Sequence, residues 1–149
     1  MDIEKIIEDV GKYHYVGCGD KKCKIMASSD SKSEAKKKAK KFLEPYINDL
    51  VGSSIYLVKI KRSTKEEWDK NKHILLPGPI YMEITEYIVQ KKKKLKESSK
   101  KFYQKVFFSE KYLKKNNNIK KSDITDLVMK HEKDQLKTGL MEANIIWFL

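Results

Sequence analysis

Residues 80–90 read Ile80-Tyr-Met-Glu-Ile-Thr-Glu-Tyr-Ile-Val-Gln90, and this run decides the fold class. Isoleucine or methionine stands at every second position over its first half, at residues 80, 82 and 84, and Ile88 continues the same face. A period of two residues is typical of a β-strand, whose side chains point alternately to opposite faces of a sheet. The run therefore predicts a strand, and a purely helical fold is excluded.

Further strands are predicted on the N-terminal side of this run. Residues 55–62 alternate between apolar and polar side chains, which again favours a strand. Two short strand-like runs, residues 13–18 and 23–27, flank Gly19-Asp20-Lys21-Lys22, a sequence suited to a tight turn. Together these runs predict a small antiparallel sheet of about four strands.

Helices are expected between and after the strands. Residues 2–10 have apolar side chains at helical spacing before Gly11, and residues 31–51 repeat apolar residues with the same period. Ser31 and Glu34 form a capping box, whereas Pro45 predicts a kink or a break after Leu43. Ser63 and Glu66 have the spacing to cap a short helix, and Ser122 begins a last helix.

We therefore predict an α+β fold whose helices pack on one face of the sheet, the layered arrangement expected for such a mixture. The length of 149 residues suits one domain. Within it we distinguish an α+β core (residues 1–90), a basic segment containing aromatic residues (91–121), and a C-terminal helix with an apolar tail (122–149).

The positive charge is concentrated in the basic segment. The chain carries a net charge of +12, and residues 91–121 contribute +11 of it, with 13 lysines against Glu97 and Glu110. Arg62 is the only arginine in the chain. Arginine is the side chain suited to forked contacts with guanine and phosphate, so its scarcity argues against recognition of base sequence. An AT-rich genome is an alternative reason for the lysine excess.

Leu95, Phe102, Val106 and Leu113 fit one helical stripe. A lysine-rich helical extension over residues 95–114 is therefore expected, with a strand over residues 101–113 as the alternative.

Lysines interleaved with aromatic rings suit a single nucleic-acid strand, because cations meet its phosphates and rings stack on its bases. The competing interpretations are a solvated lysine face over core aromatics, an acidic protein partner, and membrane headgroups. The candidate nucleic-acid-binding residues are Lys91, Lys92, Lys93, Lys94, Lys96, Lys100, Lys101, Phe102, Tyr103, Lys105, Lys111, Tyr112, Lys114 and Lys115.

The chain ends on the apolar run Ile145-Ile146-Trp147-Phe148-Leu149. Such a run either closes the core as a final strand or docks into a partner protein. For the second case Trp147, Phe148 and Leu149 are the candidate partner-binding residues.

Signs of catalysis and of a bound metal are weak. The sequence has no glycine-rich phosphate loop and no nucleophile elbow, and Glu83 and Glu86 are expected on opposite faces of a strand. Cys18 and Cys23 flank the predicted turn, but their spacing differs from that of a zinc site, so free thiols are expected. Hence no enzyme, cofactor, metal or small-molecule substrate is predicted.

Two cysteines and an N-terminus without the layout of a secretory signal predict an intracellular protein, cytoplasmic or nuclear rather than secreted. No apolar run is long enough to span a membrane. We expect a non-catalytic, nucleic-acid-associated protein, DNA or RNA being equally possible, with protein partners as well. The alternative is a structural subunit of a viral or organellar particle, assembled through its apolar tail.

Overall fold

The computed structural model describes residues 3–19, 22–64, 66, 78–92, 94–98, 103–116, 118–138 and 145–148. Its N-terminal elements are α1 (Ile3–Val10), β1 (Tyr13–Cys18), β2 (Cys23–Ser29), α2 (Lys32–Leu43), the 3-10 helix η1 (Glu44–Tyr46), β3 (Ser54–Arg62) and β4 (Ile80–Gln90). The C-terminal elements are β5 (Lys94–Glu97), β6 (Tyr103–Phe108), α4 (Glu110–Asn116), α5 (Lys121–Thr138) and β7 (Ile145–Phe148).

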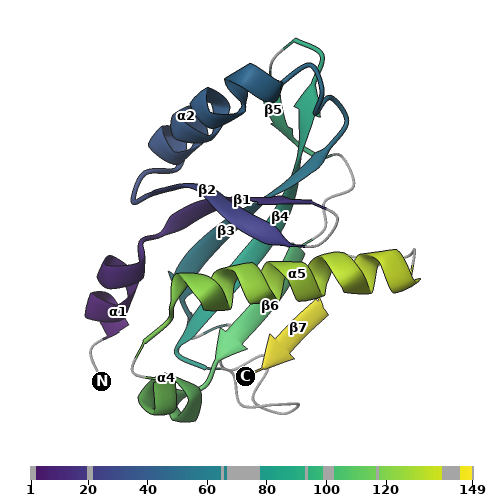
Figure 1. Ribbon diagram of the computed structural model, residues 1–149. Coiled ribbons are helices and arrows are strands. Elements are labelled where there is room, and N and C mark those ends of the chain that lie inside the picture. The colour runs from purple at the N-terminus through teal and green to yellow at the C-terminus, as the bar shows by residue number, and fades with distance from the viewer. Residues whose placement is uncertain are drawn as a thin grey trace.

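The strands form one sheet in the order β2-β1-β3-β4-β6-β7, and β5 also pairs with β4 (Figure 1). Every pair is antiparallel except β6 with β7, which is parallel. The predicted α+β class and antiparallel sheet are thus confirmed, although the sheet has more strands than the four expected.

Strand β4, the run that decided the fold class, lies in the middle of the sheet. One of its edges pairs with the full length of β3, from Ile80 opposite Arg62 to Ile88 opposite Ser54. Its other edge pairs with β6 along its first half and with β5 along its second half. β5 and β6 therefore follow one another along the same edge of β4.

The helix expected over residues 95–114 is wrong for most of its length. Residues 94–97 and 103–108 are strands β5 and β6, and a helix begins only at Glu110. The strand considered as the alternative matches β6 in part. Both faces of β6 are buried, since Gln104, Val106 and Phe108 lie on one face and Phe107 on the other. A strand buried on both faces lacks the alternation of polar and apolar residues that identifies a strand in a sequence.

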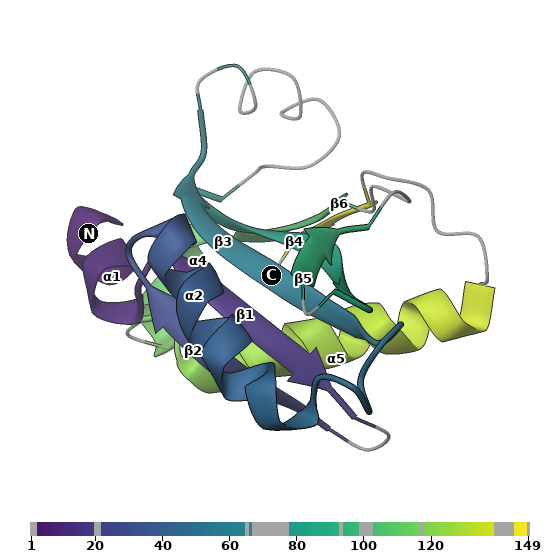
Figure 2. The same ribbon diagram turned by 90° about the horizontal axis from the view of Figure 1, so that it is seen from above.

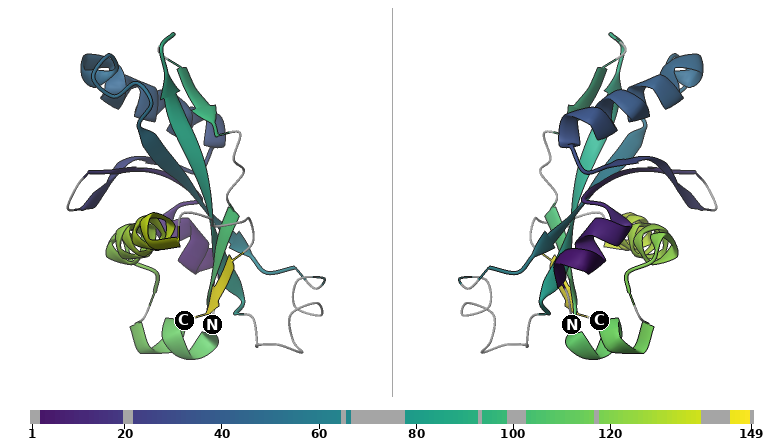
Figure 3. Two further views of the ribbon diagram at one scale, coloured as in Figure 1. Left: turned by 90° about the vertical axis from the view of Figure 1, so that its right-hand side faces the viewer. Right: turned by 90° about the vertical axis from the view of Figure 1, so that its left-hand side faces the viewer.

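Helices cover both faces of the sheet rather than one. Residues of α1, α4 and α5 share a core cluster with the even-numbered side chains of β3 and β4, such as Val58 and Met82. α2 packs on the opposite face, where its alanines meet Tyr15, Leu57 and Tyr87. Figure 2 shows α2 over β1 and β2, and Figure 3 shows the β1–β2 hairpin between α2 and α5. The strong twist of the sheet thus creates two cores.

The predicted helix signals are confirmed for α1 and α2. α1 ends at Val10, and Gly11 adopts the positive φ of +87° that favours glycine. At the start of α2 the Ser31 hydroxyl accepts a hydrogen bond from the Glu34 amide, so Ser31 is the N-cap. The second half of the predicted capping box is not formed, because the Ser31 amide donates to the Ser29 hydroxyl rather than to the Glu34 side chain. α2 stops at Leu43, and the chain tightens into η1, which contains Pro45. The short helix expected after Ser63 lies largely outside the described residues.

The β1–β2 hairpin is confirmed, but the expectation of free thiols is wrong. Cys18 and Cys23 lie opposite one another in the register of the two strands, with their Cα atoms 4.0 Å apart, and they form a disulfide. The Gly19 amide donates to the Lys22 carbonyl at 3.0 Å and closes the turn beside them. Residues that lie directly opposite each other in a hairpin are close enough for a disulfide to join them.

Candidate nucleic-acid interface

Nine of the described lysines of the basic segment form two groups, one at one end of the molecule and one around α4 and the start of α5. At one end are four lysines of the β4–β5 hairpin, which we call the hairpin lysines. They are Lys91 and Lys92 in the turn after β4, and Lys94 and Lys96 in β5. The second group, the α4–α5 lysines, comprises Lys111, Lys114 and Lys115 of α4 at the other end, and Lys120 and Lys121 at the entry to α5, where Lys121 lies beside Cys23 and Lys24 of β2. Figure 1 shows β5 at the top of the molecule and α4 at the bottom. One continuous stretch of sequence therefore forms two separate basic surfaces.

These two groups are exposed, and no acidic side chain among the described residues forms an ion pair with them. All nine side chains are exposed. The ion pairs seen in the described part of the chain join Lys59 and Lys61 to Glu83 and Arg62 to Glu4, so none of the nine lysines takes part in one. Their charges face solvent, where counterions must balance them.

Other candidate residues of this segment lie outside the described residues: Lys93, Lys100, Lys101 and Phe102. Of Tyr103 the structure describes the backbone, at the start of β6, where it pairs with Thr85.

Lys105 occupies a different place, within the sheet. The register sets Lys59 of β3 opposite Glu83 of β4, and Glu83 opposite Lys105 of β6. The Lys105 Nζ also lies over the Tyr81 ring, 5.1 Å from its centroid, which is a cation–π geometry. Three adjacent strands thus bring two lysines and a carboxylate into one row.

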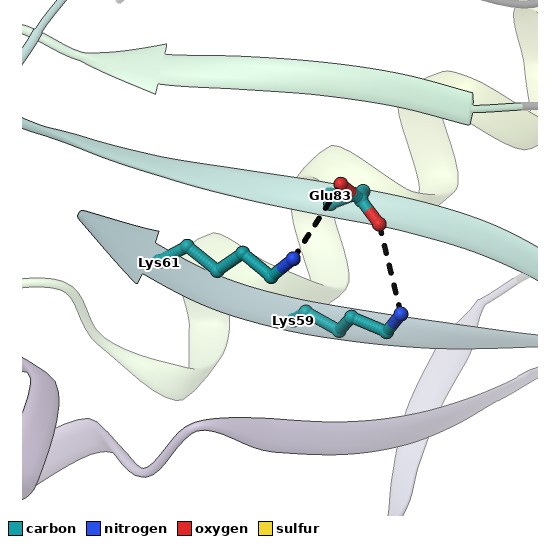
Figure 4. A network of polar contacts seen from close by, with 3 residues as sticks. All are labelled: Lys59, Lys61 and Glu83. Atoms are coloured by element: carbon teal, nitrogen blue, oxygen red, sulfur yellow. Dashed lines mark ion pairs between the residues drawn. The ribbon is translucent and has the colours of Figure 1, made fainter. Parts of the chain in front are cut away.

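A third lysine completes this cluster around Glu83 (Figure 4). The Glu83 carboxylate lies 3.7 Å from the Lys59 Nζ and 4.0 Å from the Lys61 Nζ. The Glu83 side chain is only 12% exposed and that of Lys59 19%, whereas Lys61 is 44% exposed. One carboxylate therefore lies among three lysines, including Lys105, and the cluster keeps a positive charge. We call Lys59, Lys61, Glu83 and Lys105 the sheet cluster.

A cavity of about 310 Å³ opens beside the sheet cluster, between α1 and the end of β3. Its lining includes Lys12, Lys59, Lys61 and Arg62 together with Glu4, which is paired with Arg62. The only arginine of the chain is thus engaged by a carboxylate. Cations predominate around this opening, which suits an anionic group better than a cationic one.

The sheet cluster was not predicted from the sequence. Lys59 and Lys61 are two residues apart on a strand, which places them on one face, and this was a signal for a shared site. Glu83 was considered only with Glu86. The structure confirms that those two carboxylates point to opposite faces of the sheet. Glu83 faces Lys59 and Lys61, whereas Glu86 accepts a hydrogen bond from the Ser54 hydroxyl at 2.5 Å.

The aromatic rings described in the basic segment serve the core. Phe107 and Phe108 are buried. Tyr112 is half-buried on α4, its ring centroid lies 5.5 Å from that of Phe108, and its hydroxyl donates to the Asp123 Oδ1 at 2.9 Å. Partial burial, with this hydrogen bond, raises the pKa of the Tyr112 phenol to about 12. Tyr112 thus joins α4 to α5.

The apolar C-terminal run forms the edge strand β7. In the register with β6, Ile145 pairs with Gln104, Trp147 with Val106 and Phe148 with Phe107. Leu149 lies outside the described residues. The backbone of this run is therefore part of the sheet.

No metal site is found in the described residues, where no group of three or more His, Cys, Asp and Glu side chains is suitably placed. The sulfurs of Cys18 and Cys23 are bonded to each other. His14 is buried, with its Nδ1 2.7 Å from the Ser28 Oγ and its Nε2 3.3 Å from the Gly11 carbonyl oxygen. Both ring nitrogens of His14 thus have partners within the fold.

Comparison with known proteins gives no relative: no family model matches the chain, and no curated protein or solved structure is significantly similar to it. Of the helices in the described residues, none is both long enough and apolar enough to cross a membrane.

Proposed function

We propose that this protein is a non-catalytic nucleic-acid-binding protein that contacts the phosphate backbone without reading base sequence. The observation that carries the proposal is the set of nine exposed lysines of residues 91–121, none of which forms an ion pair within the described residues. Lysines that neutralise phosphates release the cations condensed on the nucleic acid, and this release drives binding.

The distribution of the lysines supports contact with an extended polyanion. Strand β5, which carries two of the hairpin lysines, and α4, which carries three of the α4–α5 lysines, lie at opposite ends of the molecule (Figure 1). A small anion can neutralise only one of these ends, whereas a nucleic acid that runs along the molecule can meet both. The sheet cluster adds a third basic position, on β3, β4 and β6.

The pairing of the only arginine with a carboxylate supports nucleic-acid binding that does not depend on base sequence. Forked hydrogen bonds from arginine to guanine are the commonest specific contact with DNA. Arg62, the only arginine, is paired with Glu4. Lysine contacts with phosphate fix position but carry no sequence information.

A salt titration with matched variants tests the proposal. We expect affinity for single-stranded and duplex oligonucleotides of mixed sequence to fall steeply with salt. Replacing the four hairpin lysines by glutamine should reduce the slope of log K against log salt by about 0.7 to 0.9 for each phosphate that the variant no longer neutralises. The control replaces Lys37, Lys38, Lys40 and Lys41, four exposed lysines of α2, and changes the net charge equally.

Two results would contradict the proposal. One is binding that does not depend on salt, and the other is an equal reduction of the slope in the hairpin variant and in the α2 control. The second result would mean that total charge, rather than the position of these lysines, determines binding. A corresponding variant of the five α4–α5 lysines shows whether both ends contact the same ligand.

The proposal includes an intracellular location, cytoplasmic or nuclear, where nucleic acid is present. The Cys18–Cys23 disulfide does not support this part, because disulfides persist mainly in oxidising compartments. Maleimide modification in freshly lysed cells shows whether Cys18 and Cys23 are free thiols or a disulfide in the cell. Modification of both cysteines agrees with a reducing compartment, whereas protection of both contradicts it.

The alternative, a structural subunit that docks through Trp147, Phe148 and Leu149, has less support. Ile145–Phe148 is a strand whose backbone pairs with β6, so its release to a partner would cost the sheet an edge strand.

A further inference from the structure

The large apolar side chains that are exposed in the described residues all belong to one ten-residue segment. They are Phe42 at the end of α2, 46% exposed, Tyr46 in η1, 55% exposed, and Val51 in the following loop, 39% exposed. Single exposed apolar residues are common on protein surfaces, but several in one place mark an interaction site. This segment contributes nothing to the basic surfaces described above.

A groove of about 270 Å³ lies beside Phe42, whereas Tyr46 and Val51 are not part of its described lining. Phe42 and Leu50 from the segment form one wall, and Cys18 and Met26 of the β1–β2 hairpin form the other, with Ile55 of β3 also in the lining. Most of its lining is apolar, as in pockets that receive an anchoring side chain of a partner.

Both walls of the groove are held in place. The disulfide between Cys18 and Cys23 ties the two strands of the hairpin together. On the other side, the Gly52 amide donates to the Val89 carbonyl at 2.9 Å, and the Val89 amide donates to the Ser53 carbonyl at 3.2 Å. These bonds fasten the loop to β4. The groove is therefore formed before any partner arrives, which lowers the entropic cost of binding.

The charge around the groove indicates what binds there. Lys24 is the one charged residue in the described lining, which contains no carboxylate. Next to Phe42, the last turns of α2 carry the exposed lysines Lys37, Lys38, Lys40 and Lys41. Glu44 and Asp49 are the acids of the exposed segment, fewer than the lysines around it. A second copy of this chain, which also carries a net charge of +12, would be repelled.

We infer that this groove docks a short acidic segment of a partner protein, which inserts an aromatic or aliphatic side chain beside Phe42 and places carboxylates near Lys24 and Lys38. The inference does not depend on nucleic-acid binding, since the hairpin and α4–α5 lysines take no part in it. Apolar anchoring supplies affinity, and the charges supply selectivity for acidic sequences.

The probe for the test is a random-peptide display library, selected against the full chain and then counter-selected against the Phe42→Ser variant. We expect the enriched peptides to combine acidic residues with a bulky apolar residue. Phe42 is exposed, so its replacement should leave the fold intact, which thermal unfolding checks. Binding of a selected peptide, measured by calorimetry, should weaken about tenfold or more in Phe42→Ser.

A second variant alters the shape of the groove from the other wall. A Cβ added at Gly17 would lie 2.8 Å from the Met26 Sδ, so Gly17→Ala must displace the flexible Met26 side chain. We expect this variant to fold and to bind the selected peptide more weakly. It keeps the inference testable even if Phe42→Ser proves unstable.

Two double variants with the same change of charge test whether the groove selects acidic peptides. Lys24→Glu with Lys38→Glu should abolish binding of the selected peptide, whereas Lys111→Glu with Lys114→Glu, the same change on α4, should leave it nearly unchanged. Enriched peptides without acidic residues, an equal effect of both pairs, or no peptide that depends on Phe42 would overturn the inference. So would a dimer of the wild-type chain that Phe42→Ser dissociates in sedimentation, because the occupant would then be a second copy.

Discussion

Cys18 and Cys23 face each other across the last pair of the β1–β2 hairpin and are joined by a disulfide. Cys23 is buried in the core that contains α5, and Cys18 packs against the same core. The disulfide therefore joins the two strands at the tip of the β1–β2 hairpin. This tip contacts both the core that contains α5 and the apolar groove.

Reduction of this disulfide should destabilise the protein. The bond closes a loop of about six residues, and the loop-entropy relation gives a stabilisation of about 2 kcal/mol for that length. We expect the free energy of unfolding in urea to fall by about that amount when a phosphine reductant is added. The Cys18→Ser, Cys23→Ser double variant should be insensitive to the reductant. Equal stability of the wild-type chain with and without reductant would contradict the prediction.

His14 should make stability fall in mild acid. Burial is the main cause that lowers the pKa of its imidazole, and the nearby charge of Lys121 acts in the same direction. The neutral ring suits its site, because the Nε2–H donates to the Gly11 carbonyl while the Ser28 hydroxyl donates to the Nδ1. The unfolded chain therefore holds more protons than the native protein below about pH 6.5, and stability falls as the pH decreases.

Urea unfolding of the wild type and of His14→Gln, at neutral pH and near pH 5, measures this effect. We expect a smaller pH dependence in the variant. His131 is also buried but is unchanged in the variant, so the difference between the two slopes isolates His14. Identical slopes would show that the proton affinity of His14 does not change on folding.

Local sequence patterns predicted the elements whose signals lie within a few residues of each other. Examples are the N-cap at Ser31, the break after Leu43 and the tight turn between Cys18 and Cys23. Residues 103–108 lacked such a signal, because both faces of β6 are buried and the residues do not alternate in polarity. The spacing of apolar residues from Leu95 to Leu113 then favoured a helix.

The sheet cluster depends on the register between strands far apart in the sequence. Lys59, Glu83 and Lys105 meet because the register sets each opposite the next, and a shift of one residue would move them to the other face. No local pattern contains that information. For the same reason, the sequence showed how many lysines residues 91–121 contain, but not that the described ones divide between the turn and strand after β4, the sheet cluster, and α4 with the start of α5.

Glu83→Gln should affect stability and binding in opposite directions. The variant removes the one carboxylate between Lys59 and Lys61, whose Nζ atoms lie 3.7 and 4.0 Å from it. The pair with the exposed Lys61 contributes about 1 kcal/mol or less, but the variant also leaves the largely buried Lys59 without its carboxylate, so a clear decrease in stability is expected. The extra positive charge should tighten oligonucleotide binding at low salt and steepen its salt dependence. Glu44→Gln, at an exposed position at the end of α2, is the matched control, and an equal increase in affinity in both variants would exclude a direct role for the sheet cluster.

Removal of residues 145–149 should destabilise the fold rather than merely prevent association. β7 pairs with β6 through four residues, from Ile145 opposite Gln104 to Phe148 opposite Phe107. Its removal turns β6 into an open edge and costs about 1 kcal/mol for each ladder hydrogen bond that is not replaced.

Urea unfolding of the truncated protein and hydrogen exchange of the β6 amides measure this effect. We expect lower stability and faster exchange in residues 103–108. Replacing Ile145–Phe148 by four threonines is the control, because threonine favours strands and keeps the backbone ladder. This variant should recover part of the stability, by an amount that reflects the backbone pairing alone. The assembly alternative requires that the tail docks into a partner without contributing to the fold. It would be supported instead if the truncated chain kept its stability but no longer associated.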